Sequence, residues 1–185
     1  MIQYQNLNFK EGMMASSSFF FSFVSLAVML PCLLLSVSAT SYIDTICNKA
    51  KGDKAFCVKT LSAYPPAASA TSTFQAAVAT LSLGASYADK SAAFAGTAAK
   101  VNPKLKECQD AFVLISRSCK SASSELKEDP QTANYDVMLC YDSITTVKNL
   151  VGKNTDKASK TIISMTMMME KFLALAVGAT EAVGG

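Results

Sequence analysis

Apolar residues recur at steps of three and four in four successive segments of this chain. The clearest series places its apolar positions on one side of a helix: Leu105, Cys108, Phe112, Ile115, Cys119, Ala122 and Leu126. Such spacing predicts an amphipathic α-helix with a single buried stripe. Because no run of alternating β-branched residues indicates a sheet, we expect an all-α fold.

Three further segments repeat this rhythm, spanning residues 69–100, residues 130–152 and the residues from 155 or 156 onward. Their predicted inner positions are Phe74, Ala77, Leu81, Ala88 and Ala95, then Val137, Cys140, Ile144, Val147 and Val151, then Ala158, Ile162, Met165, Met169, Phe172 and Ala176. Four such helices joined by short links bury their stripes most simply as an antiparallel up-down-up-down four-helix bundle. We expect this bundle over residues 67–180, followed by a flexible tail at 181–185.

The most apolar stretch of the sequence lies near the N-terminus, from Phe19 to Val37, and ends in small residues at Val37-Ser38-Ala39. This arrangement predicts a secretory signal peptide over residues 1–39, with translation starting at Met1, Met13 or Met14. An uncleaved membrane anchor is the alternative, although Pro31 interrupts the run. Cleavage would leave a secreted protein without a membrane segment.

Cysteines in a secreted chain are read first as disulfide candidates. Cys47 and Cys57 flank a short loop rich in Lys, Gly and Asp, and Tyr64-Pro65-Pro66 separates this part from the rest. Two short helices that turn back on each other would bring the two cysteines together. We therefore predict an N-terminal helical hairpin at residues 40–66, closed by a Cys47–Cys57 disulfide.

Signal-peptide cleavage would remove Cys32, and the three other cysteines that remain can be sorted by their distance from the break at residues 129–130. If the helices on either side form an antiparallel hairpin, Cys119 and Cys140 lie at equal heights, whereas Cys108 is offset from Cys140 by eleven residues. That offset is about 16 Å at 1.5 Å per residue, whereas a disulfide requires Cα atoms within about 7 Å. We predict a Cys119–Cys140 bond and a free Cys108 thiol; three reduced core thiols are the alternative.

The composition argues against ordinary enzyme chemistry. The chain contains no histidine, which removes the usual base of a serine or cysteine nucleophile and the usual ligand of zinc or haem. Asp110, Asp136 and Asp142 have no acidic partner at a spacing that would raise a pKa. The net charge is only +3 and the lysines are scattered, so we expect no nucleic-acid partner. Methionines at 165–169 fit core packing better than copper binding, and no cofactor is expected.

Several motifs are similar to those of one known family. They are Ile43-Asp44-x-Ile46-Cys47, Phe56-Cys57-x-x-x-Leu61 with Pro65 after it, Leu105-Lys106-x-Cys108-x-x-x-Phe112, and Glu128-Asp129-Pro130 with Ala133 opening the next helix. Together they span residues 41 to about 179, and the chain resembles the plant invertase and pectin methylesterase inhibitor family. The resemblance implies a non-enzymatic, extracellular protein of the plant cell wall or apoplast. Such a protein forms a 1:1 complex that blocks the substrate cleft of a target enzyme; a vacuolar invertase would place it in the vacuole.

Two departures from the family pattern bear on the target. The family's fourth cysteine falls near Val147, so its bridge to Cys108 looks absent. Invertase inhibitors of the family place Pro-Lys-Phe in the turn where this chain has Pro130-Gln131-Thr132. Loss of the cation and the aromatic ring disfavours acid invertase, so pectin methylesterase is the expected target.

Further candidate contacts lie on the predicted first bundle helix. The resemblance implies that polar helix faces contact pectin methylesterase, and Tyr87, Lys90 and Lys100 are candidates on such a face. A solvated helix surface is their alternative interpretation. A second function from another class is a secreted carrier that holds small apolar ligands between the Ala-rich and Met-rich helices. Close helix packing explains the same alanines.

Overall fold

The computed structural model describes residues 41–185, which are all-helical, with no strand in this range. This confirms the predicted all-α class. The predicted signal peptide at residues 1–39 lies outside the described residues. Residues 41–49 form the first described helix. The elements after it are α2 (Lys54–Ser62), α3 (Pro65–Ala68), α4 (Thr73–Ala99), η1 (Pro103–Leu105), α5 (Lys106–Glu125), α6 (Pro130–Val151) and α7 (Lys157–Glu181).

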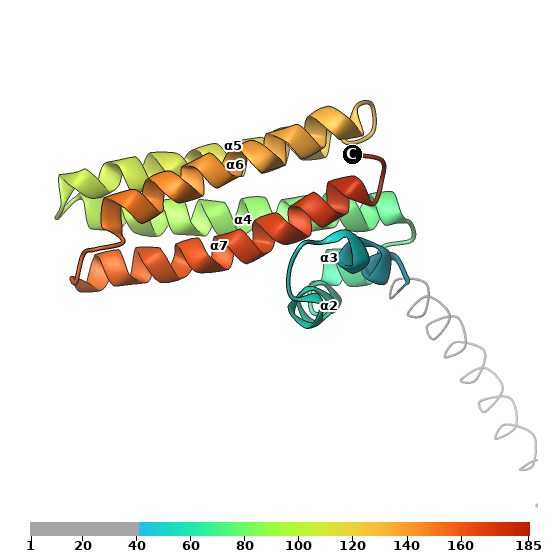
Figure 1. Cartoon of the computed structure of the whole chain (residues 1–185), viewed down its shortest axis with the longest axis horizontal. Helices are drawn as coiled ribbons and strands as arrows, with labels where there is room; N and C mark the ends of the chain where they lie inside the picture. Colours follow the sequence, from blue (N-terminus) through green and yellow to red (C-terminus); the bar gives the residue numbers. More distant parts are fainter. Residues whose placement is uncertain (1–40) are drawn as a thin grey trace, which may run out of the picture. The chain divides into compact units, whose positions relative to one another are not determined.

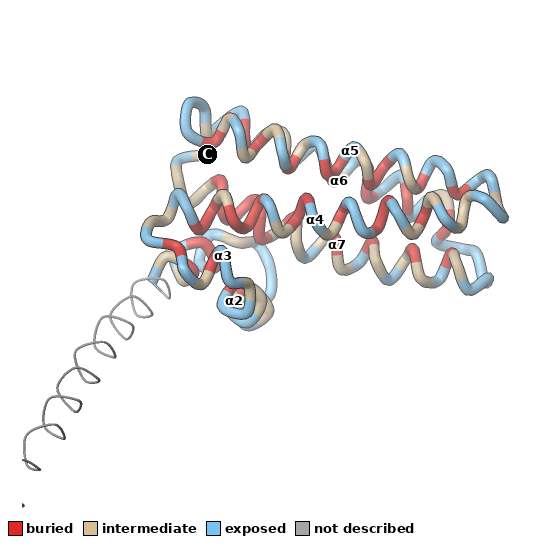
Figure 2. Tube along the Cα trace, turned by 180° about the vertical axis from the view of Figure 1, so that it is seen from behind, coloured by how far each residue is buried: buried red, intermediate tan, exposed pale blue. Residues whose placement is uncertain are grey.

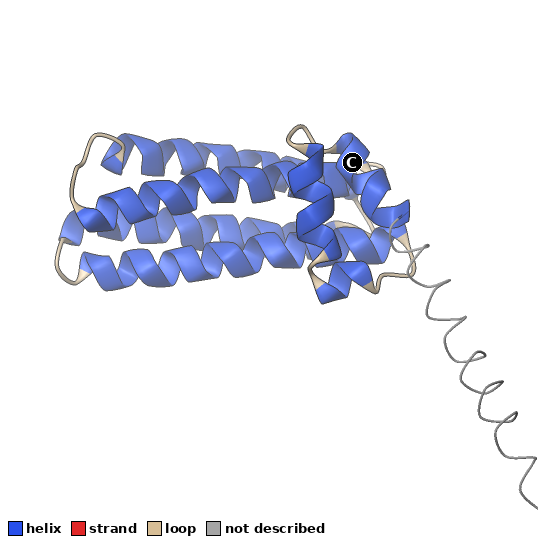
Figure 3. Ribbon diagram, turned by 90° about the horizontal axis from the view of Figure 1, so that it is seen from below, coloured by secondary structure: helices blue, strands red, loops and turns tan. Residues whose placement is uncertain are grey.

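The four long helices lie side by side, as Figures 1 and 3 show. The helix α4 packs against α5 and α7, and α6 packs against the same two neighbours. Each of the four long helices therefore packs against two of the other three. In Figure 2 the buried positions follow one stripe along each of these helices while the opposite side is exposed.

Polar side chains fix where three of the four long helices begin. Asp156 lies immediately before α7, and its carboxylate accepts a hydrogen bond from the Ser159 backbone N–H at 3.0 Å. Ser72 caps α4 in the same way, and Asp129 caps α6. Each cap satisfies a backbone donor that the first helical turn leaves unpaired. At the other end of α6, the helix stops at Gly152, the position that the sequence predicts.

The predicted stripe of α5 is confirmed in full. All seven of its predicted positions, from Leu105 to Leu126, are buried. In α4, Ala77, Leu81, Ala88 and Ala95 are also buried, but Phe74 is exposed. The prediction for Phe74 is therefore wrong: this residue lies in the first turn of α4, where its ring remains open to solvent.

The N-terminal part contains the predicted disulfide. Cys47 and Cys57 are bonded, with their Cα atoms 5.7 Å apart. The bond links the helix at residues 41–49 to α2, and Ile43, Ile46 and Leu61 add buried apolar side chains around it. This short helical pair is thus held together covalently and by its own apolar contacts.

The C-terminal residues of the chain are hydrogen-bonded to α7. The predicted tail at 181–185 starts with the last residue of α7, and the backbone N–H of Gly185 donates to the Thr180 carbonyl at 2.9 Å.

By length and composition α7 could cross a membrane, but half of its most apolar window is buried against the protein, as in a core helix.

A glycine in α7 allows the N-terminal part to approach closely. A Cβ added at Gly178 would lie 2.6 Å from the backbone nitrogen of Ala50 and 2.7 Å from its Cα. Because backbone atoms cannot yield as a flexible side chain can, we expect Gly178→Ala to lower the free energy of unfolding by about 1–3 kcal/mol. Urea unfolding measured by circular dichroism checks this value.

Gly84 in α4 provides the matched control. A Cβ there would lie 3.6 Å from Cys119 Sγ and 3.9 Å from Met169 Cε, which are ordinary contact distances. Gly84→Ala is therefore expected to be neutral or to stabilise by up to about 1 kcal/mol, through the better helix propensity of alanine. Equal losses in the two variants would contradict the close approach at Ala50.

Candidate functional site

The connection between α5 and α6 holds three of the predicted contact residues. Pro130 is the first residue of α6, and Gln131 and Thr132 follow with exposed side chains. Asp129 accepts hydrogen bonds from the Thr132 N–H at 3.0 Å and from Thr132 Oγ1 at 2.7 Å. These hydrogen bonds hold the pKa of the Asp129 carboxyl below its usual value. The turn therefore enters α6 in one defined conformation, with the Gln131 side chain free to meet a partner.

Tyr87, another predicted contact residue, has its ring engaged in packing. Its ring centroid lies 4.8 Å from that of Phe172 on α7, and Phe172 in turn makes an edge contact with Phe56 at 6.1 Å. Partial burial raises the pKa of the Tyr87 hydroxyl. The three rings form a row that joins α4, α7 and α2.

The remaining predicted contacts, Lys90 and Lys100, have exposed side chains on α4 and at its end. Lys100 lies next to the start of α5, whereas Pro130 follows the end of that helix. The 20 residues of α5 are about 30 Å long, so the two positions are far apart. The structure thus does not bring the six predicted contact residues onto one surface.

A feature that the sequence analysis missed is the outer face of α6. Tyr135, Met138 and Leu139 are 63 %, 47 % and 43 % exposed, although all three are large and apolar. They occur at steps of three and four with Gln131 and Asp142, directly opposite the buried stripe of the same helix. We call these five residues the α6 outer face. The sequence signal was present, as apolar residues that do not fit the predicted stripe.

The surroundings of the α6 outer face carry negative charge. Asp136 and Asp142 lie on α6 itself, and Glu128 and Asp129 precede it. The turn also contains one cation, Lys127, 4.0 Å from Glu128, and the first basic residue of the helix is Lys148. Lys148 binds Glu170 of α7, with 2.5 Å between Nζ and Oε1. A partner that fits this face would therefore present apolar groups together with basic ones.

A surface groove of about 410 Å³ lies where residues 51–56 meet α6 and α7. Its apolar walls include Phe56, Tyr141 and Leu175. The charged groups at its edge are used within the protein: Lys51 lies 3.8 Å from Glu181, and Lys171 Nζ lies 5.0 Å from the centre of the Phe56 ring. These contacts fasten the N-terminal part to α7 and favour a structural role for the groove.

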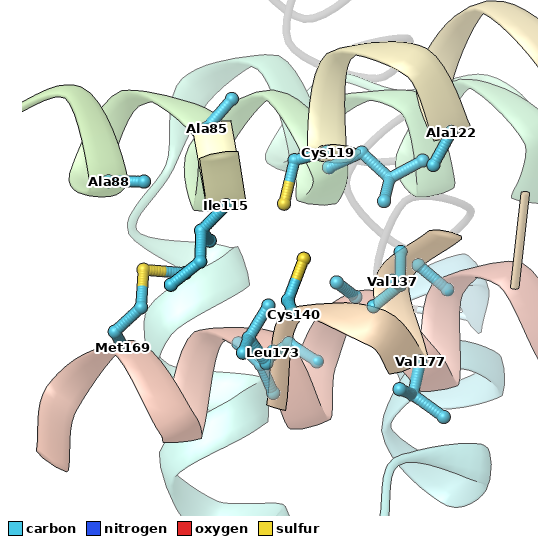
Figure 4. Close-up of a cluster of buried hydrophobic side chains, with 14 of the residues drawn as sticks. Ala85, Ala88, Ile115, Cys119, Ala122, Val137, Cys140, Met169, Leu173 and Val177 are labelled. Carbon is cyan, nitrogen blue, oxygen red and sulfur yellow. The ribbon is translucent and has the colours of Figure 1, made fainter. Parts of the chain in front are cut away.

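The interior between the Ala-rich and Met-rich helices is filled by side chains. Ala88 and Met169 are completely buried, and Figure 4 shows them in one cluster with Ile115 and Leu173. The packing of Met169 agrees with its predicted place on the core stripe. Close approach of α4 to its neighbours thus accounts for the small side chains of this helix.

Three further cysteines lie in the core. Cys108, Cys119 and Cys140 are all buried free thiols in the structure. The predicted Cys119–Cys140 bond is therefore not formed there, although the two sulfur atoms point toward one another in Figure 4. The Cys140 thiol instead donates a hydrogen bond to the Asp136 carbonyl at 3.5 Å.

Comparisons with known proteins found no match to this chain. No protein-family model matches the chain, and no curated protein and no solved structure matches it significantly. Inference about function therefore depends on the motifs and on the geometry above.

Proposed function

We propose that the protein is a non-catalytic inhibitor of a plant cell-wall carbohydrate-active enzyme, pectin methylesterase, and that it covers the substrate cleft of that enzyme. The α6 outer face carries this proposal. Exposed aromatic and methionine side chains are enriched in protein interfaces, and a few such anchors supply most of the binding energy. On α6 they follow Pro130-Gln131-Thr132, the turn at which invertase inhibitors of the similar family enter the cleft of their target.

The architecture that supports this role is an antiparallel up-down-up-down four-helix bundle. Each long helix has two neighbours, and α5 and α6 are joined by only residues 126–129. Near the connection between α4 and α5, an added Cβ at Gly96 would meet the side chain of Gln109. Farther from that connection, an added Cβ at Gly84 would lie next to Cys119. Such pairs are expected if α5 runs back along α4. A scaffold of this kind keeps the outer face in place before binding, which lowers the cost of ordering.

Charge favours pectin methylesterase over acid invertase as the target. Most glycoside hydrolases place two carboxyl groups in the cleft. The α6 outer face contains Asp142, and the turn before it carries Glu128 and Asp129 with one cation, Lys127. This region would therefore meet such a cleft mainly with like charge. The absence of Lys and Phe after Pro130 argues in the same direction.

Two alternative functions predict different experimental results. Acid invertase is the alternative target, and a secreted carrier of small apolar ligands is the alternative class. The carrier is less well supported because the alanines of α4 are packed against neighbouring side chains. Export to the cell wall is part of the proposal and depends on the apolar N-terminal segment.

A parallel titration distinguishes these functions. Purified protein is added in increasing amounts to a plant pectin methylesterase and to a plant acid invertase at mildly acidic pH. We expect methylesterase activity to fall to near zero at about one equivalent while invertase activity is unchanged. Loss of invertase activity alone would reverse the target, and no effect on either enzyme would contradict the inhibitor proposal.

A further inference from the structure

The facing thiols of Cys119 and Cys140 lie on two helices that pack against each other. Cys119 belongs to the buried stripe of α5 and Cys140 to that of α6. Figure 4 shows both sulfur atoms in the space between these helices, directed toward one another. Both side chains are buried, so the packing of α5 and α6 keeps the two sulfur atoms facing each other.

The two thiols differ in exposure and in their contacts. Cys119 is 0 % exposed and Cys140 is 2 % exposed, and Cys140 Sγ donates a hydrogen bond to the Asp136 carbonyl at 3.5 Å. The neighbouring Cys119 thiol holds the pKa of Cys140 below its ordinary value, whereas the Cys140 thiol and burial raise the pKa of Cys119. Thiolate is the reactive form, so Cys140 is the better nucleophile of the pair.

Cys108 differs from this pair in both position and environment. It lies eleven residues before Cys119 on the same stripe, about 16 Å along the helix axis. Burial raises the pKa of its thiol to about 11. Cys108 is too far away, and its thiol too rarely ionised, to take part in exchange at Cys140.

We propose that Cys119 and Cys140 form a reversible dithiol–disulfide site that links α5 to α6 when the protein meets a low-molecular-weight disulfide. The Cys140 thiolate attacks one sulfur of that disulfide, its S–S bond breaks, and the first thiolate leaves. The Cys119 thiol then loses its proton and attacks the Cys140 sulfur, which expels the second thiolate. Two cysteine thiols are oxidised to one disulfide, and the small disulfide is reduced to two thiols. This site is independent of the proposed inhibitor function.

The consequence for the protein is a covalent link behind the α6 outer face. The bond would close the segment between residues 119 and 140, which contains the turn at Asp129-Pro130. A cross-link of this kind restricts the unfolded chain and stabilises the folded one. The reduced state in the structure and the oxidised state would thus share one fold and differ in stability.

Trypsin separates the three cysteines, which makes peptide mapping decisive. Cleavage after Lys106, Arg117, Lys120, Lys127 and Lys148 places Cys108 in residues 107–117, Cys119 in residues 118–120 and Cys140 in residues 128–148. The folded protein is incubated with oxidised glutathione, its remaining thiols are alkylated, and non-reducing digests are analysed by mass spectrometry. We expect residues 118–120 linked to residues 128–148, and loss of that product on reduction.

Variants complete the test. Cys108→Ser should keep the linked peptide, and its Tm should rise on the order of 10 °C on oxidation, as for the unmodified protein. Cys119→Ser should lose both effects and stop at a glutathione adduct on Cys140. A link to Cys108, or a permanent glutathione adduct on Cys140 of the unmodified protein, would overturn the proposal, as would three free thiols after exposure to excess oxidised glutathione.

Discussion

Replacement of Phe112 by alanine is expected to lower the free energy of unfolding by about 3–5 kcal/mol. The Phe112 ring is the largest fully buried side chain of the described residues and lies in the middle of the α5 stripe. Truncation removes its burial energy and leaves a cavity that neighbouring helices fill only in part. Urea unfolding followed by far-UV circular dichroism measures the loss.

Leu114 on the same helix provides the control for that experiment. Its side chain is 56 % exposed, two residues from Phe112 and off the buried stripe. Leu114→Ala should change the free energy of unfolding by no more than about 0.5 kcal/mol. If the two variants lost similar stability, the assigned register of α5 would be wrong.

Joint replacement of Tyr135 and Met138 by alanine is expected to weaken inhibition of pectin methylesterase by about 30- to 1,000-fold. Central aromatic anchors of an interface contribute roughly 2–4 kcal/mol, and each 1.4 kcal/mol corresponds to a tenfold change in affinity. Both side chains are exposed, so the double variant should fold as the unmodified protein does. The inhibition constant from steady-state assays measures the effect.

Met167 on α7 offers a matched control for the double variant. Its side chain is 58 % exposed, and it does not belong to the α6 outer face. Met167→Ala should therefore inhibit as strongly as the unmodified protein. Equal weakening by both changes would indicate a contact through α7, and an unchanged constant in the double variant would exclude the α6 outer face as the contact.

The sequence carried much of the fold because burial imposes a regular period. The α5 stripe, the end of α6 at Gly152, the start of α7 near Asp156 and the Cys47–Cys57 disulfide were all predictable from spacing and local chemistry. Phe74 was misplaced because periodicity does not show where a helix extends beyond its neighbours.

The candidate site was less predictable, for a related reason. The helical period identifies the apolar residues of α6 that form its buried stripe. Tyr135, Met138 and Leu139 are apolar too, but they lie outside that stripe. A pattern that detects a core does not rank the apolar residues left on the surface. Cys119 and Cys140 show a second limit: spacing predicts that they face each other, whereas oxidants in the surroundings determine whether they are bonded.

Occlusion of an enzyme's substrate cleft by a non-catalytic protein is the central proposal for this molecule. The most direct measurement is the initial rate of pectin methylesterase over a range of pectin concentrations, at several fixed concentrations of the protein. Occlusion predicts that the apparent KM rises linearly with the protein concentration from its uninhibited value, while kcat stays constant. An unchanged rate at a large excess of protein, or a lower kcat with constant KM, would contradict it.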